Sequence, residues 1–494
     1  MKIHFYLLHI QDVVAYKSVG PIRGLYKEIA VPVPSSVKQY LDHQNVRYNI
    51  ANLILENFEW TLKDANASSI PTVKSTILKD GLGKVQVLYP SDSLLDLNVL
   101  NQELTRQLRA ASHDDLRSFY DQYQLESIPA LPKLSGLPTV VDLRLMQAPS
   151  LYLDSGTSDQ LLQLEQKEFL QVIGDATQLE FAVPLNKLEP QAATGSDETQ
   201  ILDAVRSFTN LRIKQRLEET LELPPLPNTA QKIIALRVDP NADINDLAGV
   251  VETDPSLAAQ VVSWAASPYY SAPGKIRSIH DAIVRVLGFD MVLNLSLGLA
   301  LGKSMNLPKD CPRGVTPYWQ QAIYTAATME SLVNAIPREH RPGVGMAYLA
   351  GLLNNFGLLV LAEIFPPHFE RVNRFIEVNP HVNHQAIERH LIGITRDQLA
   401  AWLLRVWNMP EEVETAIRYQ NQPNYSGDNH QYAKLLYIAN TKLRERHIGL
   451  GPIKEIPESL YENLHLDADA VEKCINDVMD ATEELSVIAQ QMAD

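Results

Sequence analysis

The sequence predicts a multidomain protein in which an α+β domain is followed by an all-α helical domain. The chain has 494 residues, more than one ordinary hydrophobic core accommodates, so two or three domains are expected. Short β-rich runs alternate with helical segments up to residue 174, and the pattern is helical almost without interruption from residue 201 onward. This change of hydrophobic period divides the chain.

The N-terminal half contains a hairpin signal. TVKSTILK (72–79) and KVQVLYP (84–90) flank Asp80-Gly81-Leu82-Gly83, a turn sequence between two β-rich runs. Further strands and helices alternate along this half, as is typical of an α+β domain. The further strands are predicted at 137–145 and 150–156, and the helices at 36–44, 95–104 and 166–174.

The helical half follows a stretch with little periodicity. Residues 175–200 contain Pro, Gly, Ser and Thr, which predicts a linker. Beyond it no hairpin signal occurs, and Asp243 and Asp254-Pro255 stand where helices begin. The predicted division is an N-terminal segment (1–35), the α+β domain (36–174), the linker (175–200), the helical domain (201–430) and a C-terminal helical extension packed on it (431–494).

Composition limits the compartment and the partners. Hydrophobic residues make up 45% and charged residues 21% of the chain, and no apolar run has the length of a membrane span. Asp12 interrupts the early apolar stretch and no cleavage site follows, so we expect no signal peptide, no membrane and a cytoplasmic location. Cys311 and Cys474 are too few and too far apart for a disulfide framework. The net charge of −16 disfavours nucleic acid, although a local basic groove would still bind it.

Several motifs of the helical half stand in a specific order and spacing. Residues from about 215 to 430 thereby resemble the HDOD domain, a relative of the HD-type metal phosphohydrolases. HDOD domains are parts of bacterial signalling proteins, so the resemblance implies protein partners of a signalling pathway. The motifs are Leu223-Pro224-Pro225-Leu226-Pro227, Asp254-Pro255, Ser278-Ile279-His280-Asp281-Ala282-Ile283 and Leu287-Gly288.

The positions that bind metal in HD enzymes carry other residues in this chain. Those enzymes place histidines and aspartates on several helices, where they converge on one or two ions that activate water. In GLLNNFG, for example, two asparagines replace the His-Asp pair of the family motif. The former metal positions implied by the resemblance are Gln321, Asn354, Asn355, Arg396, Gln420 and Asn421.

These substitutions predict that no metal or other cofactor is bound. An amide carbonyl is a weak ligand, its nitrogen does not bind metal, and an arginine repels a cation. A tightly held divalent ion contributes on the order of 10 kcal/mol, which this residue set does not supply. We expect a pseudoenzyme in which the scaffold is kept and an amide network fills the site. The network is expected to join Gln321, Asn354, Asn355 and Gln420.

The N-terminal half resembles a second family, the YbaK/prolyl-tRNA synthetase-associated domain, over about residues 36–174. That family includes editing enzymes that cleave wrongly attached amino acids from tRNA. The resemblance implies that Lys74 lies near the aminoacyl ester and that Gly156 and Thr157 form the Gly-Thr turn. The alternative for Lys74 is a solvated strand lysine. The motifs are SVKQYLDHQNVRYNI, TVKSTILKDGLGKVQVLYPSDSLLDLNVLNQEL, SIPALPKLSGLPTVVD and LYLDSGTSDQLLQLEQKEFLQVIG.

One motif departs from the editing family. Where the family has Gly-x-Ile/Val-Pro-Pro, this chain reads Glu126-Ser127-Ile128-Pro129-Ala130. Glu126 adds a side chain and a negative charge where an ester oxygen would become anionic. Residues 1–175 hold 16 Lys plus Arg against 20 Asp plus Glu, whereas tRNA-binding domains usually show a basic face. Both observations argue against deacylation.

We therefore expect a non-catalytic regulatory protein that acts through protein contacts. Two alternatives remain: an aminoacyl-tRNA deacylase that binds tRNA and uses Lys74, and a metal-dependent phosphohydrolase acting on a cyclic nucleotide. Trp264, Tyr269 and Tyr270 stand near a Pro-rich turn, where they either contact a partner or pack in the core.

Overall fold

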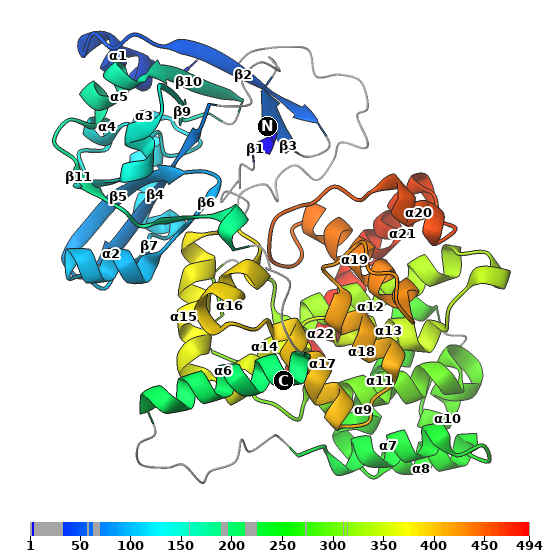
Figure 1. Ribbon diagram of the computed structural model, residues 1–494. Helices are drawn as coiled ribbons and strands as arrows, with labels where there is room; N and C mark the ends of the chain where they lie inside the picture. Colours follow the sequence, from blue (N-terminus) through cyan, green and yellow to red (C-terminus); the bar gives the residue numbers. More distant parts are fainter. Residues whose placement is uncertain are drawn as a thin grey trace. The chain divides into compact units, whose positions relative to one another are not determined.

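The structure is a computed structural model that divides into two compact units. The first contains residues 1–191 and 371–387, and the second contains residues 192–370 and 388–494 (Figure 1). Most of the predicted segment 1–35, part of the predicted linker, and Leu223 and Pro224 lie outside the described residues. The described residues are 2–3, 33–56, 59–62, 70–157, 159–188, 196–212, 225–271, 274–309, 311–313 and 315–493.

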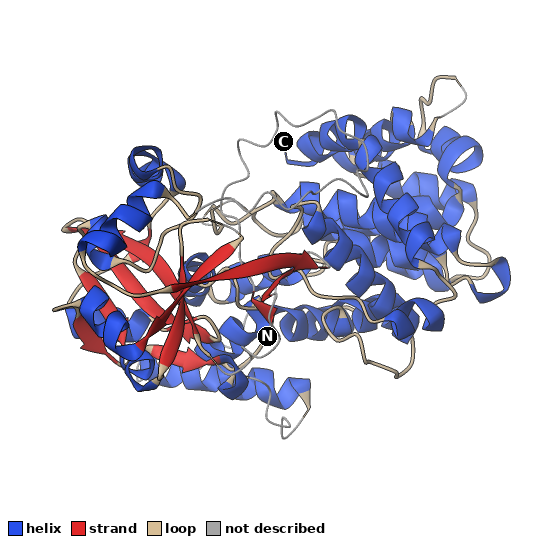
Figure 2. Ribbon diagram, turned by 90° about the horizontal axis from the view of Figure 1, so that it is seen from above, coloured by secondary structure: helices blue, strands red, loops and turns tan. Residues whose placement is uncertain are grey.

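The first unit is built on a mixed sheet, drawn in red in Figure 2. Its strands are β1 (Lys2–Ile3), β2 (Asn49–Glu56), β3 (Glu59–Leu62), β4 (Thr72–Asp80), β5 (Gly83–Pro90), β7 (Arg109–Ala110), β8 (Thr139–Asp142), β9 (Ser150–Asp154), β10 (Gln160–Glu165) and β11 (Thr177–Leu179). The order is β1-β3-β2-β10-β9-β4-β5-β8-β11, with β7 beside β4. The pairs β4–β9, β5–β8 and β8–β11 are parallel. A separate two-stranded sheet joins β6 (Ser93–Leu95) to β12 (Ala182–Pro184).

The predicted hairpin is confirmed as the pair β4–β5. The register runs from Val73↔Pro90 to Asp80↔Gly83, so Gly81 and Leu82 form a two-residue turn. The Asp80 carboxylate accepts the Leu82 N–H at 2.8 Å and forms an ion pair with the Arg106 guanidinium. Side-chain bonds therefore reinforce the turn that the sequence indicates.

The predicted helices of this half are also present. They are α1 (Ser35–His43), α2 (Leu97–Leu104) and α5 (Gln166–Ile173); α3 (His113–Tyr123) and α4 (Pro132–Ser135) were not predicted. The side chain of Asp96 caps α2, and Ser112 and Asp115 form a capping box on α3. The helices bury residues such as Val37, Leu41 and Phe169 in one core with the sheet.

The structure differs from the predictions around Asp142. The strand predicted over 137–145 ends at Asp142, whose buried carboxylate accepts the Arg144 N–H at 3.0 Å and begins a 3₁₀ turn. The same carboxylate accepts the N–H groups of Phe181 and Ala182 at 2.9 and 2.8 Å. Residues 177–184, predicted as linker, therefore form β11 and β12. Strands of three residues are too short to show an alternating pattern.

Residues 371–387 belong to the first unit although the sequence places them in the helical domain. The Asn379 side chain accepts the Leu95 N–H at 2.7 Å and donates to the Leu95 carbonyl at 3.0 Å. His381 Nε2 lies 3.0 Å from the Ser93 carbonyl oxygen and carries the proton in this bond. These contacts join β6 to residues almost three hundred positions later, which no local pattern predicts.

From residue 196 onward the described chain is helical, as predicted, and contains no strand. The side chains of Asp243 and Asp254 cap two of the helices. The elements are α6 (Asp197–Arg212), α7 (Asn228–Val238), α8 (Ile244–Glu252), α9 (Pro255–Ala265), α10 (Ile279–Ala282), α11 (Phe289–Gly302), α12 (Tyr318–Ala335), α13 (Val344–Leu352), α14 (Phe356–Ile364), α15 (Pro366–Val378), α16 (His384–Ile392), α17 (Arg396–Val406), α18 (Glu411–Tyr419), α19 (His430–Glu445), α20 (Glu458–Asn463), α21 (Ala468–Asp480) and α22 (Thr482–Ala493).

Helix α12 is the centre of the second unit. It packs against α13, α19, α21 and α22, and the Tyr324 hydroxyl donates to the Thr482 carbonyl at 3.2 Å. The helices beyond residue 430 are thus part of this core. Among the described residues no single helix has the length and apolar character of a membrane span; only α13 and α14 together reach both, with a bend of 42° between them.

Two glycines fix the break between α13 and α14. A Cβ on Gly351 would lie 2.6 Å from the Ala326 Cα on α12, so only glycine permits this approach. A Cβ on Gly357 would lie 2.4 Å from the Arg396 carbonyl oxygen at the start of α17. The two asparagines between these glycines are therefore held against α12 and α17.

Candidate functional site

An amide cluster lies where the sequence predicted the former metal positions. Helices α12, α17 and α19, the two residues after α18 and the break between α13 and α14 supply its side chains. Most of these side chains are buried in the second unit. The members are Gln321, Thr325, Asn354, Asn355, Asp397, Gln420, Asn421 and Asn440.

The cluster contains a continuous chain of hydrogen bonds. Gln420 Nε2 donates to Asp397 Oδ1 at 3.0 Å and to the Asn354 carbonyl at 2.9 Å. Asn440 Nδ2 donates to Gln420 Oε1 at 2.9 Å. Asn354 Nδ2 donates to Asn440 Oδ1 and to Thr325 Oγ1, both at 3.1 Å. Three amides are therefore linked in series to one carboxylate.

Asp397 determines the orientation of these amides. A carboxylate only accepts hydrogen bonds, so Gln420 and Asn421 must both present their NH₂ groups to it. The oxygen of Gln420 then faces Asn440, and the oxygen of Asn440 faces Asn354. Amide orientations are usually ambiguous, but here a single anion fixes each of them. Asn354 Oδ1 ends the chain, buried and without a partner among the described residues.

This donor set does not fit a metal ion. Hydrogen bonds already occupy the amide oxygens of Gln321, Gln420 and Asn440, and the NH₂ groups have no lone pair to offer. Asp397 is the only carboxylate in the cluster as defined above. Within the described ranges, no group of three His, Cys, Asp or Glu side chains is placed to hold a metal.

Arg396 occupies a different environment from the amides. Its guanidinium forms a buried ion pair with Glu388, and its backbone N–H donates to the same carboxylate at 2.9 Å. Burial raises the pKa of Glu388, while the arginine acts in the opposite direction. The positive charge of Arg396, at a predicted former metal position, is therefore neutralised by Glu388, which lies eight residues earlier in the chain.

Three members of the cluster were not predicted from the sequence. Asp397 directly follows the predicted Arg396, whereas Thr325 and Asn440 belong to no motif. Asn440 lies in the predicted C-terminal extension, beyond the residues that carry the HDOD resemblance. Among the aromatic residues singled out, Trp264 is only 2% exposed. It donates to the Tyr270 hydroxyl at 3.3 Å, so it packs in the core.

A second polar site surrounds Lys74 in the first unit. Strands β4 and β9 are parallel, with Thr72 opposite Tyr152 and Val73 opposite Leu153. Continuing this register places Lys74 beside Asp154 on one face of the sheet. The Asp154 carboxylate accepts the Ser127 hydroxyl at 2.5 Å and the Gly156 N–H at 2.7 Å.

Burial shifts the ionisation of both groups. It raises the pKa of Asp154 to about 6, against the effects of the Ser127 and Gly156 bonds and of Lys74, and the Glu126 carboxylate raises this pKa further. Burial lowers the pKa of Lys74 to about 8, against the effect of Asp154. Such opposed shifts in neighbouring groups are common at functional sites.

The Gly-Thr turn holds Asp154 in place. Gly156 has φ +91°, and a Cβ there would lie 2.5 Å from Leu125 Cδ2, so glycine is required. The Gly156 carbonyl accepts the Glu126 N–H at 2.9 Å, which docks the 126–130 loop on the turn. The Thr157 hydroxyl lies 2.9 Å from the Ser155 hydroxyl. Gly156 and Thr157 were predicted from the family resemblance, but Asp154 was not, because its partner strand is remote in sequence.

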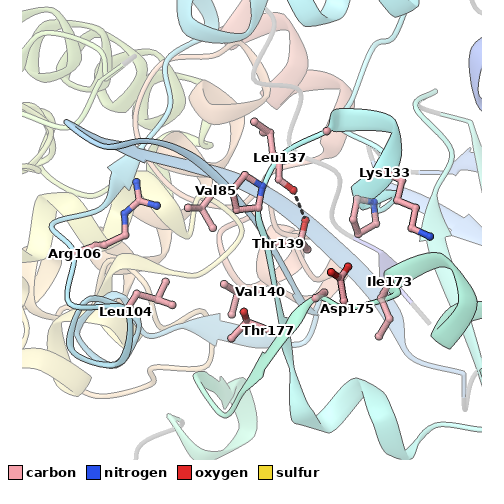
Figure 3. A pocket seen from close by; sticks show the side chains of 14 residues that line it. Val85, Leu104, Arg106, Lys133, Leu137, Thr139, Val140, Ile173, Asp175 and Thr177 are labelled. Atoms are coloured by element: carbon pink, nitrogen blue, oxygen red, sulfur yellow. Dashed lines mark hydrogen bonds between the residues drawn. The ribbon is translucent and has the colours of Figure 1, made fainter.

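A cavity of about 450 Å³ lies elsewhere in the first unit. Strands β5, β8 and β11 line it, and Arg106 and Lys133 lie on opposite sides of it (Figure 3). Arg106 is engaged by Asp80, and neither Lys74 nor Asp154 lines this cavity. We therefore regard the Lys74–Asp154 pair as the candidate site of this unit.

Comparison with known proteins identifies both units. The family model for the HDOD domain matches residues 223–423, and the model for the aminoacyl-tRNA editing domain matches residues 58–172. A solved structure from Marinobacter aquaeolei VT8, described as a signal transduction protein, is 41% identical, with a TM-score of 0.83. The match covers 94% of this chain and 100% of that one.

Two further relatives are more distant. An HDOD domain protein from Geobacter sulfurreducens is 21% identical over 60% of this chain and 99% of its own, with a TM-score of 0.45. An uncharacterized protein from Treponema pallidum (strain Nichols) is 21% identical over 249 residues, which are 50% of this chain and 47% of that protein. The chain thus spans about half the length of this curated relative.

The fold and the matches define a two-domain protein with an editing-type α/β domain and a helical HD-related domain. The chain belongs to the HDOD family and carries an aminoacyl-tRNA editing domain before its HDOD domain, as the two resemblances predicted.

The amide cluster predicts a large cost for removing its central member. In Gln420→Ala, the Asn354 carbonyl and the Asn440 amide lose their buried partner, and Asp397 loses one of its donors. We expect the free energy of unfolding to fall by about 3 kcal/mol. Urea titration measures it. The control Asn424→Ala, at an exposed position, should change it by less than about 0.5 kcal/mol; equal effects would contradict the role of the cluster.

The raised pKa of Asp154 predicts a pH-dependent stability difference. Between about pH 4 and 6 the folded carboxyl keeps its proton while the unfolded one has lost it, so wild-type stability falls as pH rises through this window. Asp154→Asn removes this titration and keeps an acceptor for Ser127. We expect the stability of Asp154→Asn relative to wild type to increase from pH 4 to 6 and then level off. A flat difference in urea titrations across this range would contradict the shift.

Proposed function

We propose that this chain is a non-catalytic regulatory protein of a signalling pathway that acts through protein contacts. The observation that carries the proposal is the amide cluster anchored by Asp397, at the positions that resemblance assigns to metal ligands. The description of the Marinobacter protein as a signal transduction protein supports it. We place the end of the editing-type domain after β12, the HDOD domain from α6 to residue 430 without residues 371–387, and its helical extension at 431–494.

The cluster is suited to structure and not to hydrolysis. Metal-dependent phosphoester hydrolysis needs a cation that lowers the pKa of water and neutralises developing charge. The amides provide neither, because they are neutral and the oxygens of Gln321, Gln420 and Asn440 already accept hydrogen bonds. A hydrogen-bonded polar cluster instead rigidifies the helices that meet there. A rigid helical surface is well suited to binding another protein.

The proposal predicts a protein without metal or phosphoesterase activity. We expect metal analysis of the full chain, purified without chelator, to find far less than one iron, manganese or zinc per molecule. Added manganese or iron should give no turnover of cyclic nucleotides or of a chromogenic phosphodiester. An HD-type phosphohydrolase assayed in parallel controls for the metal loading. Stoichiometric metal, or turnover that depends on it, would overturn the proposal.

A second candidate function is aminoacyl-tRNA deacylation by the first unit. The half-buried Lys74 beside Asp154 favours it, because an ammonium in a low-dielectric site interacts strongly with a phosphate or an oxyanion. Glu126 opposes it, because its charge already raises the pKa of Asp154 and would repel the developing oxyanion. This candidate would make tRNA a partner.

Deacylation is tested with mischarged tRNA and the variant Lys74→Ala. If the first unit is not an editing enzyme, wild type and Lys74→Ala should both hydrolyse mischarged tRNA at the uncatalysed rate. The exposed Lys38 provides the matched control Lys38→Ala. A rate that exceeds background in wild type and in Lys38→Ala, and falls by about a hundredfold or more in Lys74→Ala, would establish deacylation instead.

A further inference from the structure

The cavity of about 450 Å³ in the first unit lies where two parallel strands begin. Strands β8 and β11 are parallel, so the segments that lead into them lie at the same end of the sheet. These segments, 132–138 and 173–176, supply most of the lining. Because neither Lys74 nor Asp154 lines the cavity, it is separate from the site that these two residues form.

Much of the lining is apolar. Hydrophobic side chains reach the cavity from both segments, from β5 and β8 and from the end of α2 (Figure 3). An engineered cavity of about 150 Å³ holds a benzene ring, so about 450 Å³ accommodates an apolar body roughly three times as large. The lining hydrophobic residues include Val85, Leu104, Leu137, Val140 and Ile173.

Two charged side chains of the lining are uncompensated. Neither the Lys133 nor the Asp175 side chain forms a hydrogen bond or an ion pair with any other described residue, and they do not pair with each other. A Cβ on Gly174 would lie 3.3 Å from Lys133 Cε and 3.5 Å from its Nζ, so the lysine crosses the chain directly before Asp175. Figure 3 shows both on one side of the cavity and Arg106, which Asp80 neutralises, on the other.

This pair of charges matches a ligand that carries the two opposite charges. The carboxylate of a zwitterion would pair with Lys133, and its ammonium would pair with Asp175. A ligand with only one charged group would meet a like charge in one of these two side chains. Both side chains are exposed, so a solute reaches them and each ion pair contributes modestly. Burial of the apolar body supplies the rest of the affinity.

We propose that this cavity binds a small zwitterion with an apolar body, of the size of an apolar dipeptide. The volume of the cavity favours a body larger than one ring or one branched side chain, and Lys133 and Asp175 select the charged groups. Such a site would give the editing-type domain a small-molecule input. The inference goes beyond the proposed function and does not depend on the amide cluster, so a metal ion found in the second unit would leave it intact.

Calorimetric titration of the full chain with leucyl-leucine tests the site. Two derivatives each lack one charge: N-acetyl-leucyl-leucine lacks the ammonium, and leucyl-leucinamide lacks the carboxylate. We expect saturable binding of the dipeptide, and binding of each derivative that is weaker by about fivefold.

Two variants should each remove one of these preferences. Asp175→Asn should bind the dipeptide and its N-acetyl form alike while it still discriminates against the amide. Lys133→Gln should show the reverse. Both positions are exposed, so the variants should fold like wild type, and thermal melts verify this. The controls Asp121→Asn and Lys167→Gln, at exposed positions outside the cavity, should keep both preferences.

Four results would overturn the assignment. Absence of saturable dipeptide binding would show that no such site exists. Equal binding of the dipeptide and both derivatives by wild type would show that the charges are not recognised. Both preferences persisting in Asp175→Asn and Lys133→Gln would place the binding elsewhere. Leucine binding as tightly as leucyl-leucine would show that the ligand does not fill the cavity. None of these results bears on metal at the amide cluster, so failure of this site and failure of the proposed function are distinguishable.

Discussion

The helical unit depends on one buried carboxylate, Asp397, that accepts hydrogen bonds from neutral amide donors. Asp397 is 3% exposed, and a charge at such a position is strongly destabilising unless hydrogen bonds surround it. Gln420 and Asn421, directly after α18, donate to this carboxylate, and Asn440 and Asn354 follow because the amide oxygens of Gln420 and Asn440 each accept from the next amide. One anion thus specifies how several helices pack, since any register shift would leave a buried polar group unpaired.

The same requirement explains why the helical unit does not end where the family match ends. Asn440 on α19 lies beyond residue 423, the last residue matched to the HDOD domain, yet it joins Gln420 to Asn354. Without α19, Asn440 would be missing and the side chains of Gln420 and Asn354 would lose the residue that links them. The helices after residue 430 are therefore part of the structure that orients the amides.

The sequence predicts those features whose cause is local. The β4–β5 hairpin follows from Asp80-Gly81, and the starts of α8 and α9 follow from Asp243 and Asp254, because turns and caps depend on neighbouring residues. The meeting of Gln321, Asn354 and Gln420 was predicted through the family resemblance. Periodicity alone does not bring residues a hundred positions apart together.

Features that depend on a single remote side chain were missed. The strands β11 and β12 follow from the bonds of Asp142 to residues about forty positions later. The pairing of Lys74 with Asp154 follows from a parallel register between distant strands, and the compensation of Arg396 follows from Glu388. In each case one buried carboxylate selects its partner. Sequence periodicity predicts the type of an element, but it does not predict which distant residue a buried charged group will contact.

The amide cluster and the Lys74–Asp154 pair differ in the charge of the groups they bury. This difference indicates which of the two sites is suited to binding a ligand. In the helical unit neutral amides are linked by hydrogen bonds to one anion, an arrangement that stabilises a fold. In the first unit Lys74 and Asp154 share one face, and burial moves the two pKa values toward neutrality from opposite sides. Burying such a pair lowers the free energy of unfolding, because both Lys74 and Asp154 ionise more readily in the unfolded chain, where they are in water. A costly pair held in place by the Gly156 turn supports ligand binding by the editing-type domain. The amide cluster supports a structural role for the HDOD domain core.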